Sequence, residues 1–269
     1  MRMRALAVVA LVCLAGCSGL FADPRGTDRA TLTSAPVPTA TEETDTRVLP
    51  PGVGGGGDLR LDALVAAHRA ALTDRSYVWI ERRATARTDG GDVEPRPIRS
   101  AHVADEDCYR FWSESYTVRS GMETRVAYNY TEYVTDGVGH TRLQTFRTGE
   151  WEHYRLPAPA ASRRVGTATA RAIRKYLHLP AANVTVSVGS PDGERRYVVE
   201  GRGSAPSGVG RASNYSVAAV VDGEGLVRSL SAEYRVPGVD GPRAVIYEFS
   251  LDPSDPVTVE TPAWVDRAC

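Results

Sequence analysis

The chain has 269 residues, of which 42% are hydrophobic and 24% are charged, values that are ordinary for a globular protein. Its formal net charge of −1 argues against a nucleic-acid binder, which normally presents a strongly basic face. The part from Asp58 onward, about 210 residues, is long enough for one sizeable core.

Residues 1–16 have the features of a secretory signal peptide. Two arginines precede an apolar run over 5–15, which as a helix would span only about half of a bilayer core. Residues 14–17, Leu-Ala-Gly-Cys, resemble the lipobox of secreted lipoproteins. This resemblance implies that Cys17 becomes the mature N-terminus and carries a lipid. The alternative is an ordinary signal peptide followed by a chance cysteine.

The next segment, 17–57, is rich in Thr, Ser, Pro and Gly, poor in aromatic residues, and ends in four consecutive glycines. Such a stretch buries too little apolar surface to offset the entropy lost on ordering. We therefore predict a flexible tether between the lipidated Cys17 and a folded domain over 58–269. The implied location is the extracytoplasmic face of the cell membrane, with the protein held there by its lipid.

The pattern changes at Asp58 to that of a folded domain. Apolar residues recur at helical spacing from Leu61 to Leu72, with Asp58 as the expected N-cap. Six β-rich segments follow, and Asp136-Gly137 between two of them is typical of a tight hairpin. These segments are 77–88, 97–105, 108–118, 123–135, 138–147 and 150–155.

A second helix is predicted over 166–178, with Thr167 as its cap and Pro180 preventing its continuation. Further β-rich segments follow, and 243–251 among them shows the alternation of apolar and polar residues expected of a strand. These later segments are 183–189, 194–201, 213–222, 226–236, 243–251 and 257–260.

Consecutive strands joined by short turns require antiparallel pairing. We therefore predict an α+β fold in which about 11 strands form one strongly curved antiparallel sheet, an open half-barrel. The two helices are expected to lie against its concave side.

This order of elements, together with two short segments, resembles a family of haloarchaeal lipoproteins of unknown function. Those proteins are similar to the LolA and LppX/LprG-like lipoprotein carriers. The two segments are 260–265, Glu-Thr-Pro-Ala-Trp-Val, and the strand-turn-strand sequence over 220–230. The resemblance covers roughly residues 58–269. It implies an open half-barrel whose apolar inner face holds an acyl or isoprenoid chain, and it implies no catalytic residues.

The chain contains only three asparagines, and each lies in an acceptor sequence for N-glycosylation. Each also falls on the outward-facing parity of its predicted strand, where a glycan could be accommodated. We predict glycosylation at Asn129, Asn183 and Asn214, which requires export and so agrees with the signal peptide. The alternative is unmodified surface asparagine.

Cys108 and Cys269 are the only cysteines of the mature chain besides Cys17. In an oxidising exterior they could form a disulfide that closes a loop of about 160 residues. Because Cys269 is the last residue, the alternative is a frayed end with both thiols unbonded.

The sequence contains no recognised catalytic or metal-binding motif. Its five histidines do not form His-x-His or His-Glu-x-x-His, and no Gly-x-Ser-x-Gly elbow is present. The acidic run 105–107 is interpreted as a solvated turn, with a cation site as the alternative. We therefore predict that the protein is not an enzyme and uses no metal or cofactor.

Aromatic residues are frequent in the predicted strands. They could pack a filled core or line a lipid-sized cavity, since ligand pockets are mostly apolar with a few polar groups. The residues that we predict for such a cavity are Trp79, Trp112, Tyr128, Tyr130, Tyr247 and Phe249.

Together these features favour an exported, membrane-anchored lipoprotein that binds a lipid or other apolar ligand in a half-barrel cavity. The alternative is a surface interaction module that binds an envelope protein or a glycan and has no ligand cavity. The expected partners are the membrane, through the lipid anchor, and a lipid ligand. No nucleic acid is expected, and the sequence does not determine the oligomeric state.

Overall fold

The computed structural model of the chain describes one unit within Arg47–Cys269. The described residues are 49–87, 93–94, 98–117, 125–145, 149–180, 183–189, 194–239, 241–253, 256–266 and 269. The predicted signal peptide, Cys17 and most of the predicted tether lie outside them.

The described residues form two α-helices, α1 (Leu61–Ala70) and α2 (Ala161–Tyr176), and short 3-10 turns at Gly55–Gly57 and Ser207–Val209. The strands are β1 (Tyr77–Arg87), β2 (Val93–Glu94), β3 (Ile98–Val103), β4 (Tyr109–Thr117), β5 (Arg125–Thr135), β6 (Val138–Thr145), β7 (Trp151–Pro157), β8 (Val184–Gly189), β9 (Arg196–Gly203), β10 (Ser213–Asp222), β11 (Val227–Val236) and β12 (Arg243–Asp252).

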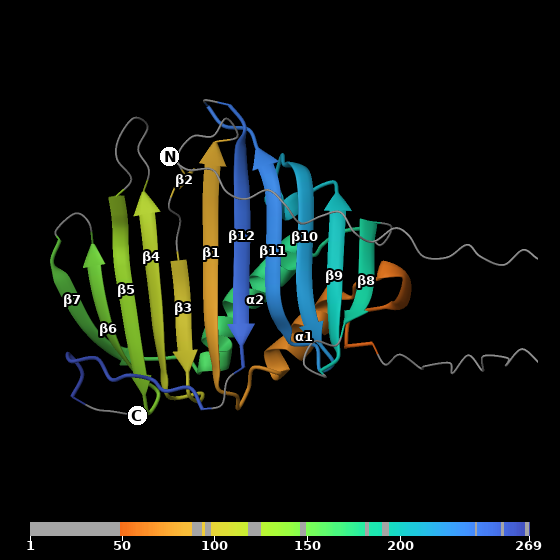
Figure 1. Cartoon of the computed structure of the whole chain (residues 1–269). Coiled ribbons are helices and arrows are strands. Elements are labelled where there is room, and N and C mark those ends of the chain that lie inside the picture. The colour runs from red at the N-terminus through yellow and green to blue at the C-terminus, as the bar shows by residue number, and fades with distance from the viewer. Residues whose placement is uncertain are drawn as a thin grey trace, which may run out of the picture. The chain divides into compact units, whose positions relative to one another are not determined.

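All strands belong to one antiparallel sheet in the order β7-β6-β5-β4-β3-β1-β12-β11-β10-β9-β8, with β2 paired to β1 outside this path (Figure 1). The first and last strands, β1 and β12, pair with each other in the middle of the sheet. Strands β7 and β8 are its two edges, so the sheet is open. The predicted α+β open half-barrel with two helices is therefore confirmed.

The face of the sheet that the helices cover is called the inner face below. Side chains along each strand alternate between this face and the outer face. In β12, Val245, Tyr247, Phe249 and Leu251 are buried while Ile246, Glu248 and Ser250 are exposed. On β8–β12 the inner-face side chains pack with α1 and α2 into one continuous apolar core. Figure 1 shows both helices against this one face.

His68 on α1 connects both helices to the sheet. Its Nε2 lies 2.7 Å from Thr169 Oγ1 on α2, and its Nδ1 accepts a hydrogen bond of 3.1 Å from the backbone N–H of Val227 on β11. The Thr169 hydroxyl donates in turn to the carbonyl of Val165. Because His68 is fully buried, these bonds satisfy ring nitrogens that water cannot reach.

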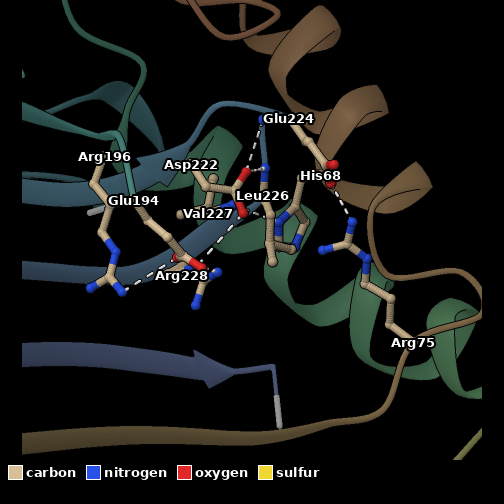
Figure 2. Close-up of polar contacts among 9 residues, drawn as sticks. All are labelled: His68, Arg75, Glu194, Arg196, Asp222, Glu224, Leu226, Val227 and Arg228. Carbon is tan, nitrogen blue, oxygen red and sulfur yellow. Dashed lines mark hydrogen bonds and ion pairs between the residues drawn. The ribbon is translucent and has the colours of Figure 1, made fainter. Parts of the chain in front are cut away.

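The turn between β10 and β11 holds Val227 in the position that His68 requires. Asp222 accepts hydrogen bonds through one carboxylate oxygen from the backbone N–H groups of Glu224, at 3.1 Å, and Leu226, at 2.9 Å (Figure 2). A short side chain that bonds to backbone groups a few residues on is the usual way to stabilise such a turn. The strand-turn-strand sequence noted over 220–230 therefore forms as predicted.

Two other local predictions have different outcomes. The hairpin at Asp136-Gly137 is confirmed, because these residues have φ of 52° and 70° and join β5 directly to β6. The strand predicted over 257–260 is wrong, since the structure has no strand there. Both edges of β12 are already paired, and the N–H of Val257 bonds to the Ser76 hydroxyl instead.

The second helix starts at Ala161, earlier than the predicted start at 166, and Thr167 lies within it rather than capping it. Its N-terminus is capped from a distant segment. The Glu106 carboxylate accepts hydrogen bonds from the Ser162 N–H, at 3.0 Å, and the Ser162 hydroxyl, at 2.9 Å. The Glu106 carbonyl accepts the N–H of Ala161. A cap supplied by the β3–β4 loop leaves no local signal near the helix itself.

The folded part also begins earlier than the boundary predicted at Asp58. Val53 is buried and forms a β-bridge with Leu59, and Leu49 packs against the core. Gly52 has φ of +84°, and a Cβ there would lie 2.3 Å from the backbone nitrogen of Leu64. This close approach requires glycine, so a segment that is Gly-rich in sequence is here part of the packed domain.

Candidate ligand cleft

A cleft of about 380 Å³ lies between α2 and the inner face of the sheet. Its walls come from α2 on one side and from β1, β3, β4 and β12 on the other. The lining residues are Glu81, Arg83, Arg99, Phe111, Arg164, Thr167, Ala168, Arg171, Ala172, Lys175, Tyr176 and Tyr247.

The sheet wall combines aromatic rings with charged groups because strand pairing places aromatic and charged residues of different strands on the same part of the sheet. Arg83 of β1 lies opposite Tyr247 of β12, and Glu81 of β1 lies opposite Arg99 of β3. Phe111 of β4 completes this wall. The five side chains share the inner face because alternate residues of a strand point the same way.

The helix wall is a single stripe of α2. Arg164, Ala168, Arg171 and Lys175 recur at spacings of three and four residues and therefore lie on one side of the helix. Ala168 is small, which leaves space between helix and sheet at the middle of the stripe. Cationic side chains from α2, β1 and β3 therefore line the cleft.

Two of the five cations are paired with carboxylates. Arg99 lies 3.3 Å from Glu81, and Arg164 forms an ion pair with Glu132 of β5. For Arg83, Arg171 and Lys175, no carboxylate partner is found among the described residues. The cleft therefore carries an excess of positive charge.

Burial and neighbouring charge both act on the ionisable groups of the cleft. Partial burial lowers the pKa of Lys175, and the positive charge of Arg83 lowers it further. Burial raises the pKa of Tyr247, as does the nearby Glu81 carboxylate, and burial likewise raises the pKa of Tyr176. The two tyrosines therefore remain neutral hydroxyl groups, whereas the charged form of Lys175 is electrostatically destabilised.

The six predicted cavity residues do not lie together in the structure. Tyr247 lines the cleft, and Tyr130 lies beside it, within 3.4 Å of an Arg164 nitrogen. Trp79 and Phe249 are almost fully buried in the core. Tyr128 is half-buried on the inner face, outside the cleft lining. Trp112 lies on the outer face, where its indole N–H donates to Asn129.

The cationic residues of the cleft were not among the site residues predicted from the sequence. One signal was available, since Lys175 is the only lysine among 32 basic residues. The stripe on α2 is also visible as cations and alanines at helical spacing. The contributions of β1 and β3 could not be found in this way, because they depend on strand pairing.

Comparison with known families gives a match over residues 2–268, nearly the whole chain, to a family described as "Family of unknown function (DUF7537)". The chain belongs to the DUF7537 family. A search of curated proteins finds no match to this DUF7537 chain.

Solved structures similar to this DUF7537 protein include a DUF1329 family protein from Desulfovibrio piger, with 9% identity, coverage of 77% of this chain and 95% of that one, and a TM-score of 0.21. MucB in complex with MucA(peri) matches at 9% identity, 72% and 98% coverage, and a TM-score of 0.13. The Pseudomonas aeruginosa MucA/MucB complex matches at 10% identity, 72% and 99% coverage, and a TM-score of 0.12. At TM-scores this low, the likenesses carry no inference about this chain.

Two cysteines of the DUF7537 chain are joined in the structure. Cys108 and Cys269 form a disulfide with a Cα–Cα distance of 5.7 Å. The Cys269 N–H also donates to the Tyr133 hydroxyl, which in turn lies 3.0 Å from Thr261 Oγ1. The end of the chain is thereby held against β5.

The three sequon asparagines lie away from the cleft. Asn183 and Asn214 are exposed, and both lie near Gly203, at one end of β8–β10. Asn129 is half-buried on the outer face, where it accepts the hydrogen bond from Trp112. None of the three would place a glycan in the cleft.

Among the described residues, no three His, Cys, Asp or Glu side chains are grouped closely enough to hold a metal ion. The acidic segment 105–107 lies in the β3–β4 loop, where Asp105 and Asp107 are exposed as expected of a solvated turn and Glu106 caps α2. No helix in the described part of the chain is long and apolar enough to cross a membrane.

Proposed function

We propose that this protein is an exported, lipid-anchored binding protein that catalyses no reaction and holds one amphiphilic, lipid-like molecule in the cleft under α2. The observation that carries this proposal is the cleft itself. Its volume lies within the range of small-molecule sites. Its lining offers Phe111, Tyr176 and Tyr247 to an apolar group and several hydrogen-bond donors to a polar one.

The proposed ligand belongs to a narrower class of molecules than the apolar ligand expected from the sequence. Most of the inner face of β8–β12 is filled by the protein's own side chains, and the cleft lies on the part of this face beside β1, β3 and β4. Five of its lining residues are cationic, which suits a molecule with a polar head better than a purely apolar one. The resemblance to LolA-like carriers, whose half-barrels hold acyl or isoprenoid chains, supports the lipid-like part.

The anchor is proposed from the sequence. The basic n-region, the short apolar run and the lipobox-like end at Cys17 all support export followed by lipidation. The three sequons agree with an extracytoplasmic location. A tethered protein can pass its ligand only within reach of its linker, so we expect it to act close to the membrane surface.

Substitution of Cys17 tests the anchor. In Cys17→Ser the thioether lipid cannot form, so we expect the protein to leave the detergent-rich phase on detergent phase partitioning and its N-terminal peptide to lose the lipid mass. Cys13→Ser is the matched control, since residue 13 would be removed with the signal peptide. Unchanged partitioning and peptide mass in Cys17→Ser would rule out lipidation at this position.

Filling the cleft tests the ligand. Ala168 faces the cleft from α2 and is half-buried, so Ala168→Phe should occupy the ligand's space. We expect wild-type full-length protein, purified from membranes of its own host, to yield a lipid on solvent extraction and mass spectrometry. The ratio of lipid to protein should fall at least about tenfold in Ala168→Phe.

Arg163→Phe introduces the same bulk at an exposed position of α2 that does not line the cleft, and it should retain the lipid. Equal lipid recovery from wild type and Ala168→Phe would contradict binding in the cleft. If wild type carries no lipid at all, the alternative of a surface interaction module is favoured.

A further inference from the structure

Three cations meet in the cleft without a carboxylate to balance them. Arg83 comes from β1, and Arg171 and Lys175 come from successive turns of α2. Arg171 is exposed at the mouth, whereas Arg83 and Lys175 are half-buried. Within the described part of the chain, none of the three has an ion-pair partner.

Such an arrangement costs stability in the absence of a ligand. Arg171 and Lys175 are four residues apart on one helix, a spacing at which like charges repel. Lys175 also faces Arg83 across the cleft, and the repulsion grows as water is excluded between the walls. Burial disfavours the charge on Lys175, and Arg83 adds to this effect.

Several other arginines have the carboxylate partner that these three lack. Arg99 and Arg164 each have a carboxylate on a neighbouring strand. At the exposed surface, Arg174 pairs with Asp62 and Arg75 pairs with Glu224. A negative group supplied by a ligand would give the three remaining cations the partner that the chain does not.

We infer that the ligand of this cleft carries a phosphate monoester head group, held by Arg83, Arg171 and Lys175. This inference rests on the proposed function and specifies the class of molecule that is bound. A phosphate monoester brings nearly two negative charges and three acceptor oxygens at neutral pH, enough to engage three cations at once. Arginine suits this role because its planar guanidinium binds phosphate through two N–H groups.

The rest of the lining fits an apolar chain attached to such a head. Tyr247 lies opposite Arg83 on the sheet wall, Phe111 lines the same wall two strands away on β4, and Ala168 and Ala172 leave room along α2. A carboxylate head would bring one charge and leave much of the positive excess uncompensated. A cationic head would add positive charge to an already positive cleft, and a zwitterionic head would bring no net negative charge to balance it.

Lys175 provides a direct readout, because it is the only lysine in the chain. Full-length protein in phosphatidylcholine vesicles is treated with an N-hydroxysuccinimide ester, and the acylation rate of Lys175 is followed by peptide mass spectrometry. The probes, kept below their micelle concentrations, are octyl phosphate, octanoate, octyl glucoside and inorganic phosphate. We expect saturating octyl phosphate to slow acylation about tenfold or more and octyl glucoside to have no effect. Octanoate should bind about tenfold more weakly than octyl phosphate.

Variants of the arginines test whether these side chains bind the head group. Arg83→Gln and Arg171→Gln should each weaken protection by octyl phosphate by about tenfold. Arg174→Gln, on an exposed side of the same helix, is the matched control and should leave it unchanged.

The outcomes separate the two proposals. If octyl glucoside protects as well as octyl phosphate, or if Arg83→Gln and Arg171→Gln bind normally, the phosphate head group is excluded while a ligand in the cleft stands. Equal protection by inorganic phosphate and octyl phosphate would exclude the lipid-like chain and support the head group. If no probe protects Lys175 and no lipid co-purifies, both proposals fail.

Discussion

Replacing Cys108 and Cys269 together by serine is expected to lower the free energy of unfolding by about 5 kcal/mol. The disulfide joins residues 161 positions apart, and in the chain-entropy model so long a loop restricts the unfolded chain strongly. The loss should be visible as a lower denaturant midpoint in equilibrium unfolding followed by circular dichroism.

The same substitution should also release the C-terminal end. The bond and the Cys269 N–H contact to Tyr133 hold residue 269 beside β5, and Tyr133 is fully buried. Limited proteolysis should therefore cut the end of the chain faster in the double variant. Reductant should destabilise wild type to the level of the variant and leave the variant itself unchanged. A wild-type midpoint that does not respond to reductant would contradict a stabilising disulfide.

Stability is expected to fall by about 3 kcal/mol between pH 7 and pH 4 on account of His68 alone. Burial lowers the pKa of this imidazole to about 4, and the charge of Arg69 contributes to the shift. In the unfolded chain the pKa is about 6.5. The unfolded state therefore takes up the proton first as the pH falls. The contribution of His68 is fully present above about pH 6.5 and is lost progressively down to about pH 4.

The hydrogen bonds explain why the charged form is excluded. His68 accepts the N–H of Val227 at Nδ1, so a proton on that nitrogen would face another donor. Nε2 then carries the hydrogen that is donated to Thr169. Protonation would break the bond to β11 and bury an unpaired charge between the two helices.

The measurement is the difference in unfolding free energy between pH 7 and pH 4 in wild type and in His68→Gln. Carboxylates titrate in the same range, so the quantity of interest is how much smaller this difference becomes in the variant. His178→Gln removes an exposed histidine and should keep the wild-type pH dependence. An equal pH dependence in wild type and His68→Gln would show that His68 is not the group responsible.

Prediction from sequence succeeded where the pattern is local. The alternation in β12 identified its buried face, because the pleat of a strand sends successive side chains to opposite sides. The hairpin at Asp136-Gly137 was recognisable because few residues tolerate positive φ at two successive positions. Short turns between strands then required antiparallel pairing, from which the half-barrel followed.

Prediction failed where a distant residue sets the local structure. The start of α2 depends on Glu106 from the β3–β4 loop, so the sequence around residue 160 carries no cap signal. Gly52 looked like part of a flexible tether, yet it is glycine because the backbone of Leu64 approaches it closely. In both cases the local structure depends on contact with a distant segment, which the local composition does not reveal.

The sequence by itself determined the two helices, the order of most strands and the faces of those strands, and it is the basis of the export and lipidation proposed from residues 1–17. These features depend on residues close together in the chain. Only the tertiary structure decided which aromatic residues fill the core and which cations meet in a cleft. Arg83 and Lys175 are far apart in sequence and come together because β1 lies at the centre of the sheet while α2 crosses its inner face. Strand pairing and helix packing are long-range events, and the charge balance of a cleft exists only after they have occurred.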